Sequence, residues 1–256
     1  MKLRRPVPLW ALLLAILIAG STAAGLVFLP RLLGPDFNLT LSSNPILVQA
    51  GDWNYSIVKV EGVRGFVGVV SLGIVTSSGG LTAELNQGPG VSNPQSQIGL
   101  GTTGSLTLNI RSTGIGDYPV RIVATGGSAS HYVDLVVRVQ NLGMNFNPTS
   151  LTLARGTSGT VGISLTSLNG LSGNISSQAF ACYYSTEFYT CPGQVDKHVT
   201  AQFTSNNFIL QPGGSATVTL TVTVDSSDAA GTDQVWVTTT KNLWKFGPTT
   251  IQLTIV

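Results

Sequence analysis

The feature that most constrains the fold is an internal repeat. Two halves of the chain carry the same motifs in the same order. Each set opens on Asn-Pro, at Asn44 and again at Asn147, an offset of 103 residues. Each set closes on an apolar run, VDLVVRV at Val133–Val139 and TIQLTIV at Thr250–Val256. A repeated order of motifs indicates one structural unit used twice.

The repeat predicts two domains of similar size, residues 36–140 and 144–256. Units of roughly 105–115 residues can each bury a core of their own. The connection between them is only Gln140–Gly143, and so short a linker predicts a stiff rod.

Alternation of apolar and polar residues predicts that both units are built from β-strands. Phe37–Leu41 alternates, Pro45 ends that strand, and the pattern resumes through Ser56–Val60. Thr, Ser, Gly and Val dominate, as many short strands with tight turns require, and no helical period follows Leu29. We therefore expect about seven strands per unit in an antiparallel β-sandwich.

The shared alternation also predicts which side chains form the two cores. In the first unit these are Val58, Val60, Leu72, Leu108, Val120, Ile122 and Val137. In the second they are Ile163, Leu165, Leu220, Val235, Val237 and Leu253.

The motifs resemble a known class of domain. In the first unit they are Ala50-Gly51, Gly65-Phe66-Val67-Gly68, Leu81-Thr82-Ala83 and Gly116-Asp117-Tyr118-Pro119-Val120. In the second they are Arg155-Gly156, Gly170-Leu171-Ser172-Gly173, Val199-Thr200-Ala201 and Gly231-Thr232-Asp233-Gln234-Val235. This set resembles the tandem immunoglobulin-like β-sandwich repeats of exported archaeal and bacterial cell-surface proteins. The resemblance implies a spacer or binding module and no particular activity.

The N-terminus predicts export. Val7–Leu29 carries no charge over 23 residues, enough to cross a hydrocarbon core as a helix. Positive charges in residues 1–6 favour a cytoplasmic tip, which makes the segment an uncleaved signal-anchor followed by a hinge at 30–35. The rival interpretation is a cleaved signal peptide with its apolar region at Leu9–Ala19 and its cleavage site within Ser21–Ala24.

An insertion at residues 180–197 distinguishes the second unit from the first. It holds the two cysteines of the chain, Cys182 and Cys191, and in an exported protein such a pair predicts a disulfide. The zinc alternative has little support, because only His198 lies near and zinc needs about four ligands.

The insertion is also rich in aromatic residues. Counting turns along an antiparallel sandwich places it at the tip farthest from the membrane. There the aromatic side chains suit contact with a glycan or a protein, or fold back over the loop. The candidate binding residues are Tyr183, Tyr184, Phe188 and Tyr189. The same counting places the turn Lys241–Gly247, with Trp244 and Phe246, against the first unit as an interdomain prop.

No catalytic set is visible, so we predict that the chain is not an enzyme and binds no cofactor. His131 and His198 are isolated and suit strand ends better than general bases. The spacing of a calcium loop is absent from Asp225, Asp228 and Asp233. These residues indicate a polar turn or, alternatively, a weak exposed Ca²⁺ site. The prediction is that the chain binds no metal. With charged residues at only 9% and no basic patch, nucleic acid is not an expected partner.

Three sequons are candidate glycosylation sites in an exported chain: Asn38, Asn54 and Asn174.

Taken together, the sequence predicts a single-pass membrane protein with both domains extracytoplasmic. Its predicted role is that of a non-catalytic spacer or accessory protein of the cell envelope, with membrane lipid, envelope proteins or surface glycans as partners. The alternative is an adhesion or binding module that uses the aromatic loop.

Overall fold

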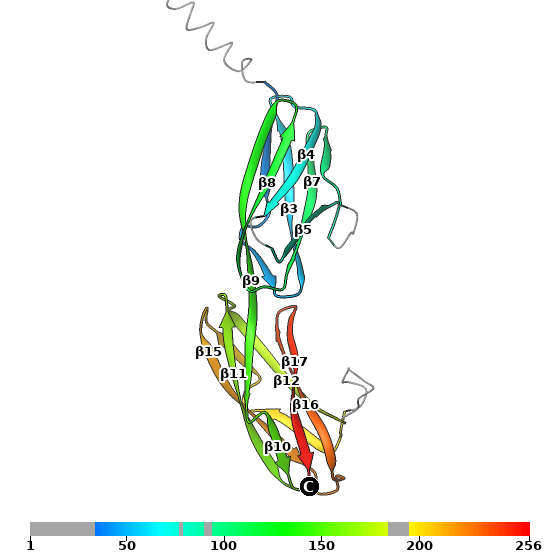
Figure 1. The fold of residues 1–256 in the computed structure, drawn as a ribbon, viewed down its shortest axis with the longest axis vertical. Coiled ribbons are helices and arrows are strands. Elements are labelled where there is room, and N and C mark those ends of the chain that lie inside the picture. The colour runs from blue at the N-terminus through cyan, green and yellow to red at the C-terminus, as the bar shows by residue number, and fades with distance from the viewer. Residues whose placement is uncertain (1–33, 77–78, 90–93, 184–194) are drawn as a thin grey trace, which may run out of the picture.

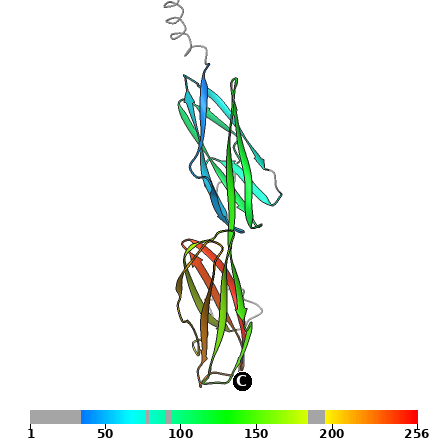
Figure 2. The ribbon, with the colours of Figure 1, turned by 90° about the vertical axis from the view of Figure 1, so that its left-hand side faces the viewer.

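A computed structural model describes residues 34–76, 79–89, 94–183 and 195–256. These residues form two β-structured bodies stacked end to end in a rod (Figures 1 and 2). The first described residues and the C-terminus lie at opposite ends of that rod (Figure 1).

The strands range from 4 to 19 residues and mostly alternate between buried and exposed side chains. Those of the first body are β1 (Asp36–Leu41), β2 (Ile46–Gln49), β3 (Trp53–Val63), β4 (Gly68–Thr76), β5 (Leu81–Asn86), β6 (Gln97–Leu100), β7 (Thr103–Ser112) and β8 (Gly116–Gly126). The strand β9 (Ala129–Asn147) follows. Those of the second body are β10 (Ser150–Leu153), β11 (Ser158–Leu168), β12 (Gly173–Tyr183), β13 (Val199–Phe203), β14 (Asn207–Leu210), β15 (Ser215–Val224), β16 (Gly231–Lys241) and β17 (Trp244–Ile255).

Each body is a two-sheet sandwich. In the first, the sheet β1-β3-β7-β5 faces a sheet in which β9 pairs β8, β8 pairs β4 and β4 pairs β6. In the second, β10-β17-β16-β12-β14 faces β13-β15-β11, which is completed by the far half of β9.

The pairings of the two bodies correspond one to one. The β4 strand pairs β6 and β8 in the first body, as β12 pairs β14 and β16 in the second. The strand β7 lies between β3 and β5, as β15 lies between β11 and β13. The sequence repeat is therefore a repeat of topology, although the sequence did not predict the short strands β6 and β14.

The strand β9 belongs to both bodies. Its first half pairs with β8, from Ala129 to Val139, and its second half pairs with β11, from Asn141 to Asn147. The segment Gln140–Gly143, expected to be a linker, is strand: Gln140 pairs with β2 and Asn141–Gly143 with β11. The long green strand in Figure 1 shows this continuity from one sandwich into the next.

Two pairings differ from the expected antiparallel arrangement. The strand β2 pairs with β9 in parallel, and β10 pairs with β17 in parallel. In each unit the Asn-Pro step, at Asn44-Pro45 and Asn147-Pro148, separates a first strand in one sheet from a short strand in the opposite sheet. Because the chain continues in the same direction after crossing over, the short strand lies parallel to the last strand of its unit.

Two separate clusters of buried side chains fill the sandwiches, one drawn from Phe37–Val139 and the other from Leu142–Ile255. All thirteen predicted core residues are buried, with no more than 5% of any of them exposed. Alternation along the strands thus predicted the inward faces correctly.

The structure leaves the predicted anchor, residues 7–29, outside the described residues. Within the described ranges, no helix has the length and apolar character needed to cross a membrane.

Candidate functional site

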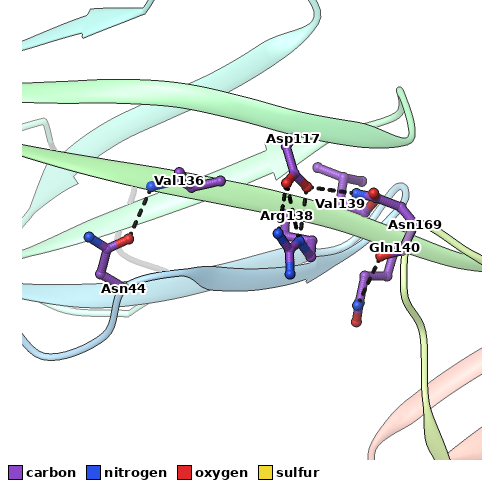
Figure 3. A network of polar contacts seen from close by, with 7 residues as sticks. All are labelled: Asn44, Asp117, Val136, Arg138, Val139, Gln140 and Asn169. Carbon is purple, nitrogen blue, oxygen red and sulfur yellow. Dashed lines mark hydrogen bonds and ion pairs between the residues drawn. The ribbon is translucent and has the colours of Figure 1, made fainter. Parts of the chain in front are cut away.

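The junction between the two sandwiches is held by a polar network. Asp117 of β8 accepts hydrogen bonds from Arg138 of β9, at 2.8 Å from Nη2 and 3.0 Å from Nε, and from Asn169 Nδ2 at 2.9 Å. Asn169 lies in the turn between β11 and β12, so this contact joins the second sandwich to the first (Figure 3). These donors lower the pKa of Asp117, the Arg138 guanidinium most and the Asn169 amide next.

Asn169 makes further contacts across the junction. Its Nδ2 also donates to the Val139 carbonyl at 3.1 Å, and its own carbonyl accepts from Gln140 Nε2 at 3.1 Å (Figure 3). Its backbone has φ = 53°, a left-handed conformation that asparagine tolerates better than most residues, and Gly170 continues it at φ = 78°. The turn Asn-Gly is therefore the local reason that this amide faces β9.

A second contact crosses the junction on its other side. Gln49 Nε2 of β2 donates to the Lys245 carbonyl at 2.5 Å, which ties the first sandwich to the start of β17. Phe246, also on β17, is 3% exposed and packs edge-to-face on Trp244, with ring centroids 6.4 Å apart. The turn Lys241–Gly247 therefore faces the first unit as expected, while its aromatic rings pack on the core of the second.

Side-chain hydrogen bonds hold the Asn-Pro step at the start of the first unit against β9. Asn44 Oδ1 accepts from the Val136 amide at 3.1 Å (Figure 3). Its Nδ2 donates to the Asp134 carbonyl at 3.1 Å. These bonds attach the end of the first strand to β9 beside the parallel pairing of β2. The parallel pairing of β2 with β9 is thus reinforced by side-chain hydrogen bonds as well as by the backbone ladder.

The cysteine insertion is only partly described. Cys182 is 4% exposed near the end of β12, and no free cysteine occurs in the described part of the chain. Cys191, Tyr184, Phe188 and Tyr189 lie outside the described residues, and the Tyr183 side chain is not described. The disulfide and the aromatic binding loop therefore stay predictions.

Three aspartates meet at the far end of the second sandwich. Asp196 lies near the end of the insertion, Asp228 lies between β15 and β16, and Asp233 lies on β16. One carboxylate oxygen from each lies within 4.8 Å of the other two, and the three residues are only 1%, 6% and 4% exposed, respectively. A cavity of about 170 Å³ is lined by these carboxylates and by residues 229–232 and Ile255.

This acidic cluster is electrostatically unfavourable by itself. Burial contributes most to raising the pKa of Asp233 to about 7, followed by a side-chain hydrogen bond with Asp196 and the negative charges of Asp196 and Asp228. Asp228 Oδ1 accepts from the Ala229 amide at 2.7 Å, but Oδ2 of Asp228 and Oδ2 of Asp233 are buried without a hydrogen-bond partner.

The sequence found only part of this cluster. Asp228 and Asp233 were candidates, but they are buried and not exposed as expected, and Asp225 is exposed outside the cluster. Asp196 was missed because more than thirty residues separate it from the other two in sequence. No local spacing signals such a contact; only the pairing of β12 with β16 brings these segments together.

The two histidines lie at strand ends, as expected, and contact neighbouring aspartates. His131 Nε2 lies 2.6 Å from Asp36 Oδ1, and its ring packs edge-to-face on Phe37. The His198 amide donates to Asp196 Oδ1 at 2.7 Å. The first contact attaches β9 to the start of β1, and the second is local to the segment before β13.

The three sequons differ in their surroundings. Asn38 and Asn174 are exposed on strands. Asn54 Nδ2 donates to the Leu47 carbonyl, and the Ser56 of its sequon is 1% exposed. The structure therefore leaves Asn38 and Asn174 as the accessible candidates.

Among the solved structures that this chain resembles are three domain structures at 10–16% identity. The D00-D0 domain of Intimin is 16% identical, with 85% of this chain and 96% of that chain covered and a TM-score of 0.37. Domains 5-6 of the S-layer protein SbsC are 15% identical, with 87% and 100% covered and a TM-score of 0.30. The C-terminal domain of the Streptococcus agalactiae AgI/II polypeptide BspA is 10% identical, with 86% and 100% covered and a TM-score of 0.38.

No protein-family model and no curated protein sequence matches the chain. The likeness to these solved structures assigns no ligand, partner or activity to this chain.

Proposed function

We propose that this protein is an extracytoplasmic, non-catalytic spacer of the cell envelope, anchored in the membrane through residues 7–29. The observation that carries the proposal is the sharing of β9 by both sandwiches. A flexible linker lets two domains sample many orientations, whereas a continuous strand paired on both sides restricts them to few. Stiffness along one axis is the property that a spacer needs.

The polar junction supports the same role. Asn169 of the second sandwich contacts Asp117 on β8, and Gln49 on β2 contacts Lys245 of the second sandwich, so the two attachments use different strands of the first sandwich. Two such attachments on either side of β9 oppose bending about it. The described ends lie at opposite ends of the rod, so an anchor before residue 34 would place the second sandwich far from the membrane (Figure 2).

The proposal is tested by measuring height above a bilayer. The full chain is reconstituted in vesicles that carry an acceptor dye on lipid headgroups, with a donor on Glu61→Cys or on Arg155→Cys. Glu61 pairs with Asn38, at the end of the rod where the described chain begins. Arg155 follows β10, near the opposite end of the rod. We expect efficient energy transfer from position 61 and little from position 155.

The control inserts a flexible Gly-Ser segment between Leu142 and Gly143, which interrupts β9 and should raise transfer from position 155. Equal transfer from both positions in the uninterrupted protein would contradict the spacer proposal, as would recovery of the intact chain free of membranes.

The second candidate is binding through the aromatic insertion. The described residue that favours it is Phe180, which is 40% exposed on β12 where the strand leads into the insertion. Retention of the purified chain on immobilised envelope glycans, lost when Phe180, Tyr184 and Tyr189 are all replaced by Ser, would support this function. Equal retention by the triple variant would exclude the loop as the binding surface.

A further inference from the structure

We propose that Asp196, Asp228 and Asp233 form a calcium site that closes the far end of the second sandwich. The site is independent of the spacer role and rests on separate residues.

The first argument is geometric. Calcium binds oxygen ligands at about 2.3–2.6 Å, so two oxygens on opposite sides of one ion lie up to about 5 Å apart. The three carboxylate oxygens lie within 4.8 Å of one another and can therefore all reach a single ion. Magnesium holds its ligands at about 2.0–2.1 Å, which limits opposite oxygens to about 4.2 Å and fits the observed spread less well. Zinc prefers nitrogen and sulfur ligands.

The second argument is the state of the oxygens themselves. Asp228 and Asp233 are each more than nine-tenths buried. The Oδ2 atom of each carboxylate is buried and has no hydrogen-bond partner. Neither residue takes part in an ion pair within the described ranges. An unpaired buried charge is costly, and buried charges in proteins are normally paired or bound to a metal. A divalent cation would satisfy both oxygens at once.

The third argument is space. The cavity beside the carboxylates holds about 170 Å³, and a water molecule occupies about 30 Å³ in the liquid. There is room for an ion and the waters that would complete six to eight ligands. The lining also includes Thr232, whose hydroxyl is a further oxygen ligand candidate.

A bound ion would connect three separate parts of the chain. Asp196 ends the insertion, Asp228 belongs to the turn before β16, and Asp233 lies near the start of β16 opposite Leu253 of the last strand. Calcium would therefore fasten the base of the insertion to the central strands of its sheet. The expected consequence is a second sandwich that melts at a higher temperature with calcium than without.

The test uses the full chain in mild detergent, freed of metal with a chelator and then titrated with CaCl₂ or MgCl₂ at neutral pH. We expect the melting temperature of the second sandwich to rise by about 4 °C or more at millimolar CaCl₂ and by less with MgCl₂. Calorimetric titration should give about one Ca²⁺ per chain.

Three variants give the test its specificity. Asp228→Asn and Asp233→Asn should each lower calcium affinity at least tenfold, while Asp225→Asn is the matched control. Asp225 is an exposed neighbour whose Oδ1 accepts from the Ser227 amide at 2.8 Å, a bond that the asparagine retains. The control should respond to calcium like the unmodified chain.

The variants also guard against simple misfolding. In chelator, Asp233→Asn removes one of three crowded carboxylates, so it should melt no lower than the unmodified protein. An unmodified protein without a calcium response would overturn the proposal. So would an undiminished response of Asp233→Asn, and an equal response to magnesium would overturn the assignment to calcium.

Discussion

Replacing Asn169 is the sharpest test of how the junction is held. Asn169→Gly removes the amide that bonds Asp117 and the Val139 carbonyl, while glycine accepts the backbone at φ = 53°. A hydrogen bond contributes about 0.5–1.5 kcal/mol to stability, and the Asp117 side chain is 42% exposed, so its bond belongs at the lower end. We expect a loss of about 1–2 kcal/mol in the free energy of unfolding.

Asn169→Ala should cost more than Asn169→Gly. It loses the same two bonds and also places a Cβ at a positive φ, which adds about 1 kcal/mol. The expected total is about 2–3 kcal/mol, measured by guanidinium unfolding of the two variants beside the unmodified protein.

The same variants should loosen the rod. Spin labels on Lys59→Cys and Thr217→Cys report the separation of the two sandwiches, since both positions are exposed and lie midway along their own domain. The distribution of distances between the labels should broaden in both Asn169 variants. A broader distance distribution without a loss of stability, or a loss of stability without a broader distribution, would show that the Asn169 amide affects only one of these two properties.

Asn242 provides the matched control. It has φ = 54° in the turn between β16 and β17, and the hydrogen bonds of the described residues include none from its side chain. Asn242→Gly should therefore leave stability unchanged, and Asn242→Ala should lose only the backbone contribution of about 1 kcal/mol. If Asn169→Gly were as harmless as Asn242→Gly, the role given to the Asn169 amide would be wrong.

Three further outcomes are expected. Leu165→Ala, at a core position 1% exposed, should lower the free energy of unfolding by about 2–5 kcal/mol, checked by chemical denaturation; a cost below about 1 kcal/mol would contradict its place in the core. The pKa of Asp117 is lowered from its usual value of 3.8, so its bonds stabilise the junction fully at a pH above 3.8. This stabilisation is lost as the pH falls through the lower pKa of the folded protein. The distances between the spin labels should therefore broaden only on acidification below about pH 4. In a glycosylating host, mass spectrometry of peptides should find glycan on Asn38 or Asn174 before Asn54, whose amide is already bonded to the backbone.

The sequence by itself determined the β-structure, the repeat and the cores. Alternation reports which side chains leave water, and this depends only on neighbours along one strand. Val58 and Val60, or Ile163 and Leu165, could therefore be placed in the cores without knowing which strands pair. The order of motifs likewise predicted that the two units share one topology.

Only the tertiary structure decided how the units meet and where charges gather. Gln140–Gly143 resembled a linker because Asn141 and Gly143 disfavour strands. Pairing with β2 and β11 nevertheless makes this segment part of a strand. The contact of Asn169 with Asp117 and the meeting of Asp196 with Asp233 join residues far apart in sequence. Such contacts follow from the packing of whole sheets, for which local periodicity carries no signal.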